Sequence, residues 1–346
     1  MQLVAYGAQD VYLTGNPQIT FFKVVYRRHT NFAVEAIEQT FNGNIDNSAS
    51  AARGTCHVAR NGDLITNVYL KCDLSGSSLT AGYDVINTVE LQIGGTKIDR
   101  HYGHWLRVWN DLTGRGDVSS SQTAIVSGSA TKNYIPLQFF FCRNPGLALP
   151  LIALQYHDVR IEFEFNAAEG DVPTISNAEL LVEYIYLDSE ERKRFAQASH
   201  EYLIEQLQYS PETLIQGAEN KVSLNLNHPC KELIWTMSGV ELESAQLKLN
   251  GHDRMSVQPA MYFQHVQALQ HHTSSPSEGT YLYSFALNPE EHQPSGTCNF
   301  SRIDNAELHL TTMSGQTDGT GTARVYATNY NVLRIMSGMG GLAYSN

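Results

Sequence analysis

Apolar and polar residues alternate along several stretches of this chain. In residues 158–165 every second residue is aliphatic or aromatic, and the residues between them are charged. The same period of two recurs at residues 64–74, 88–93, 222–226, 245–249, 306–310 and near 323–330. Because successive side chains of a strand point to opposite faces, this period predicts half-buried antiparallel strands in both halves of the chain.

A short charged segment separates the two halves. Asp188 can accept a hydrogen bond as the N-cap of a helix, and Glu191, three residues later, can complete a capping box. The residues that follow alternate in charge, which is typical of a solvated helix face. The segment therefore predicts one short helix rather than a further domain.

The two halves resemble each other in order and spacing. Val89–Gly95 resembles Ala245–Gly251 at an offset of 251 − 95 = 156, and each is followed by an amphipathic helix pattern, at residues 105–112 and 262–269. Later matches have smaller offsets, in the pairs Tyr134 and Tyr281 (147), Asn144 and Asn288 (144), and Tyr184 and Tyr326 (142). Offsets that shrink steadily indicate a duplication with loop deletions in the second copy.

Each copy holds seven or eight predicted strands, the number expected of a β-sandwich. We therefore expect an all-β fold of two tandem eight-stranded antiparallel jelly rolls, with short helices in loops and a helical linker. The expected division is an N-terminal arm at residues 1–32, a first jelly roll at 33–187, the linker at 188–217 and a second jelly roll at 218–346.

Composition and charge narrow the range of functions. The chain has 23 Lys and Arg against 35 Asp and Glu, and a formal charge of −12 would repel a phosphate backbone, so we expect no direct nucleic-acid partner. The five cysteines are scattered and form no C-x-x-C pair, which favours reduced thiols over a disulfide framework or zinc site. The sequence shows neither a secretory signal nor an apolar run of the roughly 18 residues that a membrane span needs.

Candidate catalytic and metal-binding residues are few. His101 with His104, and His271 with His272, have spacings that suit metal ligands, but neither pair has a third ligand nearby in sequence. Glu162 and Glu164 lie on one face of a strand, about 7 Å apart, a spacing suited on distance alone to acid and base catalysis.

Packed or surface histidines and a solvated strand face explain these residues more simply, so we expect no catalytic residue, no metal site and no cofactor. The glycines at 338, 340 and 341 lie near the end of the chain and predict a flexible tail.

The N-terminal segment belongs to neither copy of the repeat. Asn16 as N-cap and Pro17 as first helical residue predict a short helix, and aromatic and basic side chains follow. An arm this apolar could pack on its own domain or bind a partner, and the residues alone leave both alternatives open. The candidate interaction residues are Pro17, Phe21, Phe22, Lys23, Tyr26, Arg27, Arg28, His29 and Phe32.

The arm also carries a resemblance to a known family. The segment from Thr14 to Phe32 closely resembles the N-terminal signature of double jelly-roll major capsid proteins of nucleocytoplasmic large DNA viruses. The charged segment from Asp188, continuing to Gln206, resembles the connector between the two domains of that family, and residues 329–344 resemble its C-terminus. The resemblance covers the whole chain.

This resemblance implies a structural virion protein that is not an enzyme. It implies a homotrimer forming a pseudo-hexagonal capsomer, because three chains with two lobes each give six similar lobes, and an icosahedral shell tiled by these capsomers. It also implies an arm that meets neighbouring capsomers and minor capsid proteins, an inner membrane that is near but not spanned, and assembly in the host cytoplasm.

Two other functions are compatible with a double jelly roll. A glycan-cleaving amidase would use clustered carboxylates in a cleft, with Glu162 and Glu164 as its best candidates. A carbohydrate-binding protein would need aromatic residues in the loops at one end of a sandwich.

Overall fold

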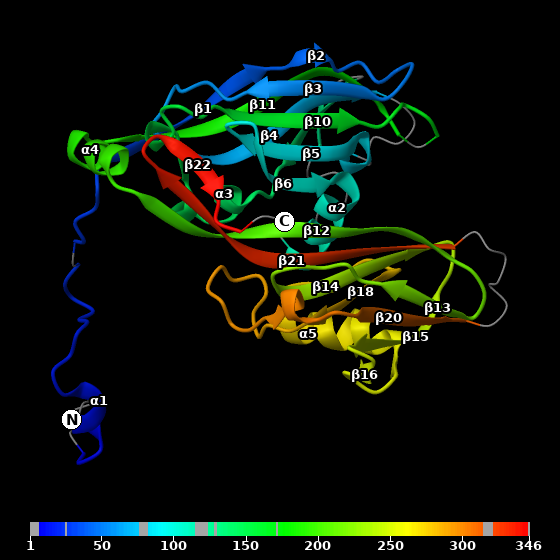
Figure 1. The fold of residues 1–346 in the computed structure, drawn as a ribbon. Coiled ribbons are helices and arrows are strands. Elements are labelled where there is room, and N and C mark those ends of the chain that lie inside the picture. Colours follow the sequence, from blue (N-terminus) through cyan, green and yellow to red (C-terminus); the bar gives the residue numbers. More distant parts are fainter. Residues whose placement is uncertain are drawn as a thin grey trace.

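Figure 1 shows two stacked β-rich units and an N-terminal arm that extends away from both of them. The computed structural model of the chain describes residues 7–24, 26–75, 82–114, 124–127, 130–170, 172–313 and 321–344. Helix α2 and strand β6 of the first unit lie against strands β12 and β21 of the second. These four elements form a middle layer of the molecule, to which both units contribute.

Two antiparallel sheets form the first unit. Sheet A has the order β1 (Phe32–Thr40), β11 (Thr174–Leu187), β4 (Leu64–Ser75), β8 (Ala130–Pro136) and β7 (Ala124–Ser127), with β9 (Leu149–Pro150) beside β4. Sheet B has the order β2 (Asn42–Asn44), β3 (Ala52–His57), β10 (Val159–Phe165), β5 (Ile86–Ile93) and β6 (Thr96–Tyr102).

The second unit is built in the same way. Sheet C has the order β12 (His200–Ile215), β21 (Gly321–Met336), β14 (Pro229–Ser238) and β18 (Thr280–Ser284), with β19 (Cys298–Asn299) beside β14 and β22 (Met339–Leu342) beside β21. Sheet D has the order β13 (Glu219–Ser223), β20 (Ala306–Thr312), β15 (Leu242–Leu249) and β16 (His252–Asp253), with β17 (Gln258–Pro259) beside β15.

The matching strand orders confirm the predicted all-β fold of two tandem jelly rolls. Strands β1, β11, β4 and β8 occupy the same places in sheet A as β12, β21, β14 and β18 in sheet C. The hairpin turns match as well, because Gly94-Gly95 and Asn250-Gly251 all have positive φ angles, as two-residue turns of this kind require. Short accessory strands add to the eight expected in each unit.

One predicted residue match is wrong although its strands correspond. Tyr184 of β11 points into the core of the first unit, where its hydroxyl donates to the Ala59 carbonyl at 2.7 Å. Tyr326 of β21 instead points out of its own unit and packs on Trp105, with ring centroids 5.3 Å apart. The two tyrosines therefore lie on opposite faces of equivalent sheets.

The helices correct a second prediction. Helix α2 (Gly103–Thr113) buries Trp105, Val108, Trp109 and Leu112, as its pattern predicts. Its counterpart begins as a π-helix, η4 (Tyr262–Val266), and continues as α5 (Gln267–His271). The π turn shifts the register, so Phe263 and Ala268 are buried while Leu269 is 85% exposed, and the predicted buried face was wrong.

The remaining helices are short. They are α1 (Asp10–Thr14), α3 (Phe140–Arg143) and α4 (Ser189–Gln197), with 3₁₀ turns η1 (Gly82–Val85), η2 (Pro145–Leu147), η3 (Leu151–Ala153) and η5 (Phe300–Arg302).

The predicted short helix after Asp188 is present, but it occupies only the first part of the expected helical linker at 188–217. Asp188 caps α4 by accepting from the Ser189 N–H, and α4 ends at Gln197. Strand β12 then begins at His200 and pairs with β21 along nearly its whole length. The apolar residues of this segment therefore pack as part of a sheet and not of a helix. We propose that the second domain begins with β12 rather than at residue 218.

The predicted flexible C-terminal tail is also wrong. Strands β21 and β22 form a hairpin, and Gly338, with a φ of +81°, lies in its turn. The hairpin contacts the first unit, since the Tyr156 N–H donates to the Gly338 carbonyl at 3.0 Å. A side chain at Gly340 would come within 2.9 Å of Leu154, so the glycine permits this close approach.

Two hydrophobic cores hold the molecule together. The smaller core lies between sheets C and D, and includes Trp235, Phe263 and Phe300. The larger core fills the first unit and continues into the second, where it includes Ile204, Ile234, Leu282 and Tyr326, one residue from each main strand of sheet C. Sheet C is therefore buried on both faces.

Candidate assembly surfaces

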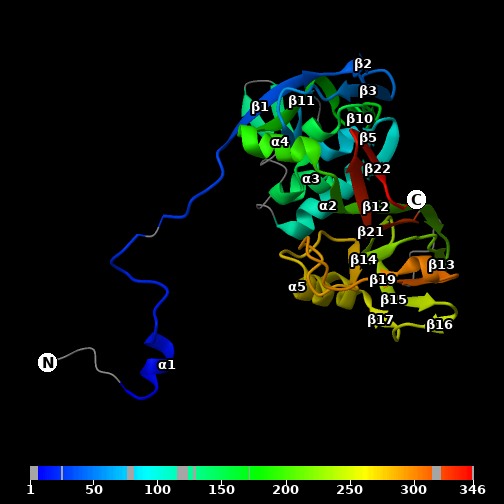
Figure 2. The ribbon, with the colours of Figure 1, turned by 60° about the vertical axis from the view of Figure 1, so that its left-hand side comes forward.

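The arm, residues 7–31, lies apart from both units (Figure 2). Its large apolar side chains are almost wholly exposed: Tyr12 95%, Leu13 88%, Ile19 89%, Phe21 97%, Phe22 94% and Tyr26 89%. Phe21 and Phe22 contact each other, with ring centroids 5.9 Å apart. Within the described residues, these side chains therefore bury almost none of their apolar surface.

The local structure of the arm differs from the prediction. Its helix is α1 (Asp10–Thr14), which lies before Asn16 rather than after it. Asn16 has a φ of +52°, outside the helical region, and residues 16–24 form no helix. An N-cap residue takes an extended backbone conformation, and the left-handed conformation of Asn16 does not provide one.

The candidate residues of the arm are exposed together. In the described residues, Lys23, Arg27 and Arg28 make no ion pair, and His29 contacts only the neighbouring Thr30 carbonyl. Phe32 is the exception in position, because it begins β1 and pairs with Leu187. Pro17, Phe21, Phe22 and Tyr26 precede it in the extended segment. The arm thus presents exposed aromatic groups beside basic groups that make no ion pair in the described residues.

Strand β1 is a surface that the sequence prediction missed. It forms an edge of sheet A, and Phe32 and Val34 are 56% and 53% exposed. In its sequence FAVEAIEQT, the apolar Phe32, Val34 and Ala36 stand at alternate positions, and this period of two was the available signal.

The two units join through the outer face of sheet C. Trp105 packs on Tyr326, Trp109 lies edge-on to the His272 ring at 6.3 Å, and the Ser274 N–H donates to the Leu112 carbonyl at 3.0 Å. Aromatic pairs in such geometry add about 0.5–1.5 kcal/mol each beyond their buried area. Helix α2 and strand β6 of the first unit therefore both contact the second unit.

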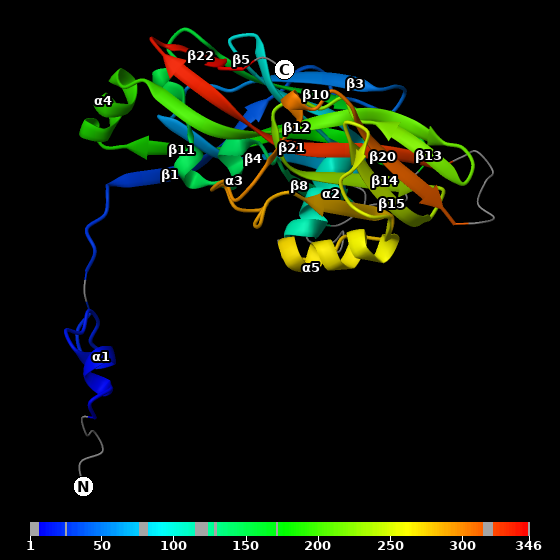
Figure 3. The same cartoon turned by 60° about the horizontal axis from the view of Figure 1, so that its bottom comes forward.

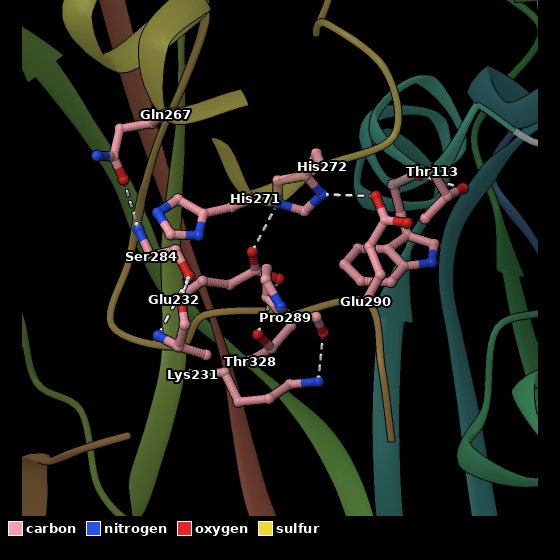
Figure 4. A network of polar contacts seen from close by, with 12 residues as sticks. Thr113, Lys231, Glu232, Gln267, His271, His272, Ser284, Pro289, Glu290 and Thr328 are labelled. Atoms are coloured by element: carbon pink, nitrogen blue, oxygen red, sulfur yellow. Dashed lines mark hydrogen bonds and ion pairs between the residues drawn. The ribbon is translucent and has the colours of Figure 1, made fainter. Parts of the chain in front are cut away.

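Buried charges lie at the same junction, and Figure 4 shows the part of this network around Lys231, Glu232, His272 and Glu290. Glu205 of β12 binds Arg143 of the first unit at 2.8 Å and Lys231 of β14 at 2.7 Å. Lys231, with a side chain only 1% exposed, also donates to the Pro289 carbonyl at 2.6 Å. The adjacent Lys231 and Glu232, inside the otherwise mostly apolar strand β14, were the sequence signal for this network.

Next to it, His272 binds two carboxylates. Its Nε2 lies 2.9 Å from Glu232 and its Nδ1 lies 3.0 Å from Glu290, and the His272 and Glu232 side chains are fully buried. Burial alone would lower the pKa of His272, but the charge and hydrogen bond of Glu232, helped by Glu290, raise it to about 9. The pKa of Glu232 is lowered, because His272 outweighs burial. At neutral pH the site is an imidazolium between two carboxylates.

The other candidate histidines have internal partners too. His101 Nε2 lies 2.8 Å from Asp99, and its ring stacks on Phe139. Burial, with nearby Arg107, lowers the pKa of His104 to about 4, so this ring is neutral against Tyr326. His271 donates to the Leu287 carbonyl at 2.9 Å. Within the described residues, no three His, Cys, Asp or Glu side chains come together in a way that would hold a metal ion.

Glu162 and Glu164 do not form a catalytic pair. Glu164 binds Arg53 of β3 in an ion pair and accepts from the Thr88 hydroxyl at 3.0 Å. Both carboxylates lie on the outer face of β10, and the inward residues of that strand are fully buried. The arrangement is that of a paired strand face.

The helices of the described part of the chain include none with both the length and the apolar character needed to cross a bilayer.

Comparison with known proteins identifies close relatives. The family model described as "Major capsid protein N-terminus" matches residues 20–188, and the model described as "Large eukaryotic DNA virus major capsid protein" matches residues 191–241 and 236–341. The major capsid protein of Pyramimonas orientalis virus is 51% identical over 100% of this chain and 99% of the relative. That of Paramecium bursaria Chlorella virus 1 is 41% identical with the same coverage.

Solved structures agree with these sequence matches. The structure titled "PBCV-1 virus capsid, quasi-atomic model" has a TM-score of 0.83 and 37% identity, covering 94% of this chain and 100% of that one. The Faustovirus major capsid protein, with 12% identity and a TM-score of 0.69 over 96% of this chain and 94% of that one, shows the shared fold alone.

Proposed function

The chain belongs to the major capsid protein family of large eukaryotic DNA viruses, and from this premise we propose that it forms a homotrimeric, pseudo-hexagonal capsomer of an icosahedral shell. It is a structural protein of the virion, as its relatives are, and not an enzyme. The amidase and carbohydrate-binding alternatives have no support from these relatives.

The matching strand orders of the two units carry the proposal. Sheets A and C, and sheets B and D, have the same strand order, so one chain presents two similar lobes. Three chains arranged about a threefold axis would supply six lobes, and a ring of six can occupy a hexagonal lattice position. Neighbouring capsomers in the shell are then contacted by lobes of two kinds in alternation.

The arm is the proposed contact with other proteins of the shell. The carrying observation is the exposure of its aromatic residues, Phe21 97%, Phe22 94% and Tyr26 89%, beside basic residues that have no ion-pair partner in the described part of the chain. We assign to the arm the contacts with neighbouring capsomers and minor capsid proteins. The residues are Pro17, Phe21, Phe22, Lys23, Tyr26, Arg27, Arg28, His29 and Phe32.

The net charge supports the position proposed for the shell. A formal charge of −12 disfavours direct contact with nucleic acid, so the genome would be separated from this protein by an inner membrane that the chain does not span. The reduced state expected for the five cysteines suits assembly in the host cytoplasm.

Deletion of residues 1–30 tests the role of the arm. Because the arm contacts neither core, the truncated chain should fold and form trimers, measured by light scattering, while failing to form shells in electron micrographs. A double variant, Phe21→Ser with Phe22→Ser, should reproduce the defect without shortening the chain.

Tyr156→Ser is the matched control, because Tyr156 is 76% exposed but lies on the body of the molecule, and it should assemble normally. Normal shells from the truncated chain would refute the proposed role of the arm. A strictly monomeric full-length protein at every concentration would refute the trimer.

A further inference from the structure

Sheets A and C have the same strand order but very different burial. The central strands of sheet C, β14 and β21, are buried on both faces for most of their length. In sheet A, the equivalent strands β4 and β11 alternate between buried and partly exposed residues. The edge strand β1 is exposed at its first five residues. The outer face of sheet A is therefore open in the single chain.

The cover of sheet C identifies what is missing from sheet A. The outer face of sheet C is covered by the first unit, where Trp105 of α2 packs on Tyr326 of β21 and strand β6 lies against β12. The element that corresponds to α2 in the second unit is the pair η4 and α5, which follows the equivalent hairpin. In the single chain this pair covers no second sheet, and Figure 3 shows α5 at the outer margin of the second unit.

Three of the exposed side chains on and beside η4 and α5 are apolar, next to the exposed His265 and Gln270. Leu269 is 85% exposed, Val266 is 40% exposed, and Met261, next to η4, is 62% exposed. The buried side of the same pair already contacts the smaller core through Phe263 and the larger core through Ala268. The exposed Val266 and Leu269 thus leave a second apolar side of this helix pair uncovered within the described residues.

The outer face of sheet A carries matching apolar positions. Val34 lies opposite Ile185, and Leu181 lies opposite Tyr69, so these four side chains share one face. Val34 is 53% exposed, and the others are partly exposed. None of them belongs to the larger core, to which β11 contributes Ile175, Ala178, Leu180, Val182 and Tyr184.

We propose that the outer face of sheet A binds η4 and α5 of a second copy of this chain, in the way that sheet C binds α2 within the chain. This contact is heterologous, because different surfaces meet, and a heterologous contact closes into a ring when its rotation permits. The inference rests on the proposed homotrimer and specifies its contact surfaces: each lobe covers the next, alternately within and between chains.

The charges of the two surfaces are compatible with this pairing. The outer face of sheet A carries Glu38, Glu179 and Glu183, and Lys71 pairs with the first two. Residues 261–271, which include η4 and α5, contain no Asp or Glu and carry exposed His265. No like-charge carboxylates would therefore meet at the contact.

Cross-linking of defined pairs tests the contact. In a Cys298→Ser background, Val34→Cys and Leu269→Cys would be combined in one chain, and the full-length protein treated with a bismaleimide reagent. We expect a covalent three-chain species on denaturing gels. Mixing the two single variants should give mainly two-chain products. The matched control pairs Val34→Cys with Leu214→Cys, because Leu214 is 60% exposed but lies at the end of β12.

The outcomes separate this contact from the trimer itself. A trimeric mass by light scattering with no more cross-linking at 34 and 269 than in the control would overturn the contact and leave the homotrimer standing. A monomer at every concentration would overturn both.

A second variant needs no cross-linker. Leu269→Glu should raise the dissociation constant of the trimer roughly tenfold or more, the factor that about 1.4 kcal/mol produces, while Leu214→Glu leaves it unchanged. Equal effects of the two glutamates would count against the contact.

Discussion

The imidazolium of His272 predicts a measurable loss of stability when it is replaced. His272→Gln keeps a polar side chain of similar size but removes the positive charge between Glu232 and Glu290. Glu232 is fully buried, so its carboxylate would keep only the Thr328 hydroxyl, at 3.1 Å, and the more distant charge of Lys231. Removing one partner of a buried pair is costly because the other charge stays buried.

The magnitude follows from the pKa of His272. That pKa rises from 6.5 to about 9 on folding, a shift that corresponds to about 3 kcal/mol of stability at low pH. Because the pKa is raised in the folded state, this contribution is fully present below pH 6.5 and is lost as the pH rises through about 9. We therefore expect His272→Gln to destabilise the protein by about 3 kcal/mol near pH 6.5 and by much less near pH 10.

Urea unfolding, followed by tryptophan fluorescence, measures this difference. Two of the three tryptophans, Trp105 and Trp109, lie at the junction of the units and report on its loss. Wild type and variant should be compared at one protein concentration, since oligomerisation changes apparent stability. Comparing them at each pH cancels the titration of groups that both share.

A double variant supplies the control. His272→Gln with Glu232→Gln removes both charges, so it should recover most of the stability lost in the single variant. The ion-pair interpretation would be refuted by a stability difference that stays constant from pH 6.5 to pH 10, or by a double variant that is less stable than the sum of its single changes.

Two further predictions concern the C-terminal hairpin and the thiols. Gly340→Ala should cost about 1–3 kcal/mol, because its Cβ would lie 2.9 Å from Leu154, whereas Gly341→Ala, with nothing within 4 Å, should be neutral; thermal unfolding distinguishes the two. In the native protein at pH 8, iodoacetamide should modify the partly exposed Cys298 first. Burial raises the pKa of Cys56 to about 11 and the pKa of Cys72 and Cys142 to about 12, which keeps these thiols protonated and unreactive. Mass spectrometry after brief labelling, with a denatured sample as reference, checks this order.

Local sequence patterns predicted much of the fold because strand burial follows a period of two. Strand β10 shows this most directly, since Val159, Ile161, Phe163 and Phe165 are buried and the residues between them are not. The Gly94-Gly95 and Asn250-Gly251 turns were equally readable, because glycine or asparagine is needed where φ is positive.

Contacts between residues far apart in the sequence explain most of the predictions that were wrong. Gly338 and Gly340 predicted a flexible tail, but in the structure they permit close contact with Tyr156 and Leu154, which lie far away in the sequence. Strand β14 has almost no alternation because both of its faces are covered, and one of those covers is the other domain. The helix expected after Asn16 is absent for a local reason instead, since the positive φ of Asn16 takes it out of the extended conformation of an N-cap.

The sequence identified the candidate residues of the arm, but not where they lie relative to the rest of the molecule. The composition of the arm marked it as unusual, but whether it would fold onto its own domain depended on contacts that no local pattern reveals. The charged junction of Glu205, Lys231 and His272 joins residues from different strands and loops, so no spacing along the chain could have grouped them.

The central place of β21 in sheet C has a consequence for protein synthesis. This strand pairs with both β12 and β14, although more than eighty residues separate it from each of them in the sequence. The first unit can fold on the ribosome once β11 has emerged, but sheet C lacks its middle strand until β21 has been made. A chain that stops before β21 would therefore lack the layer that holds its two halves together.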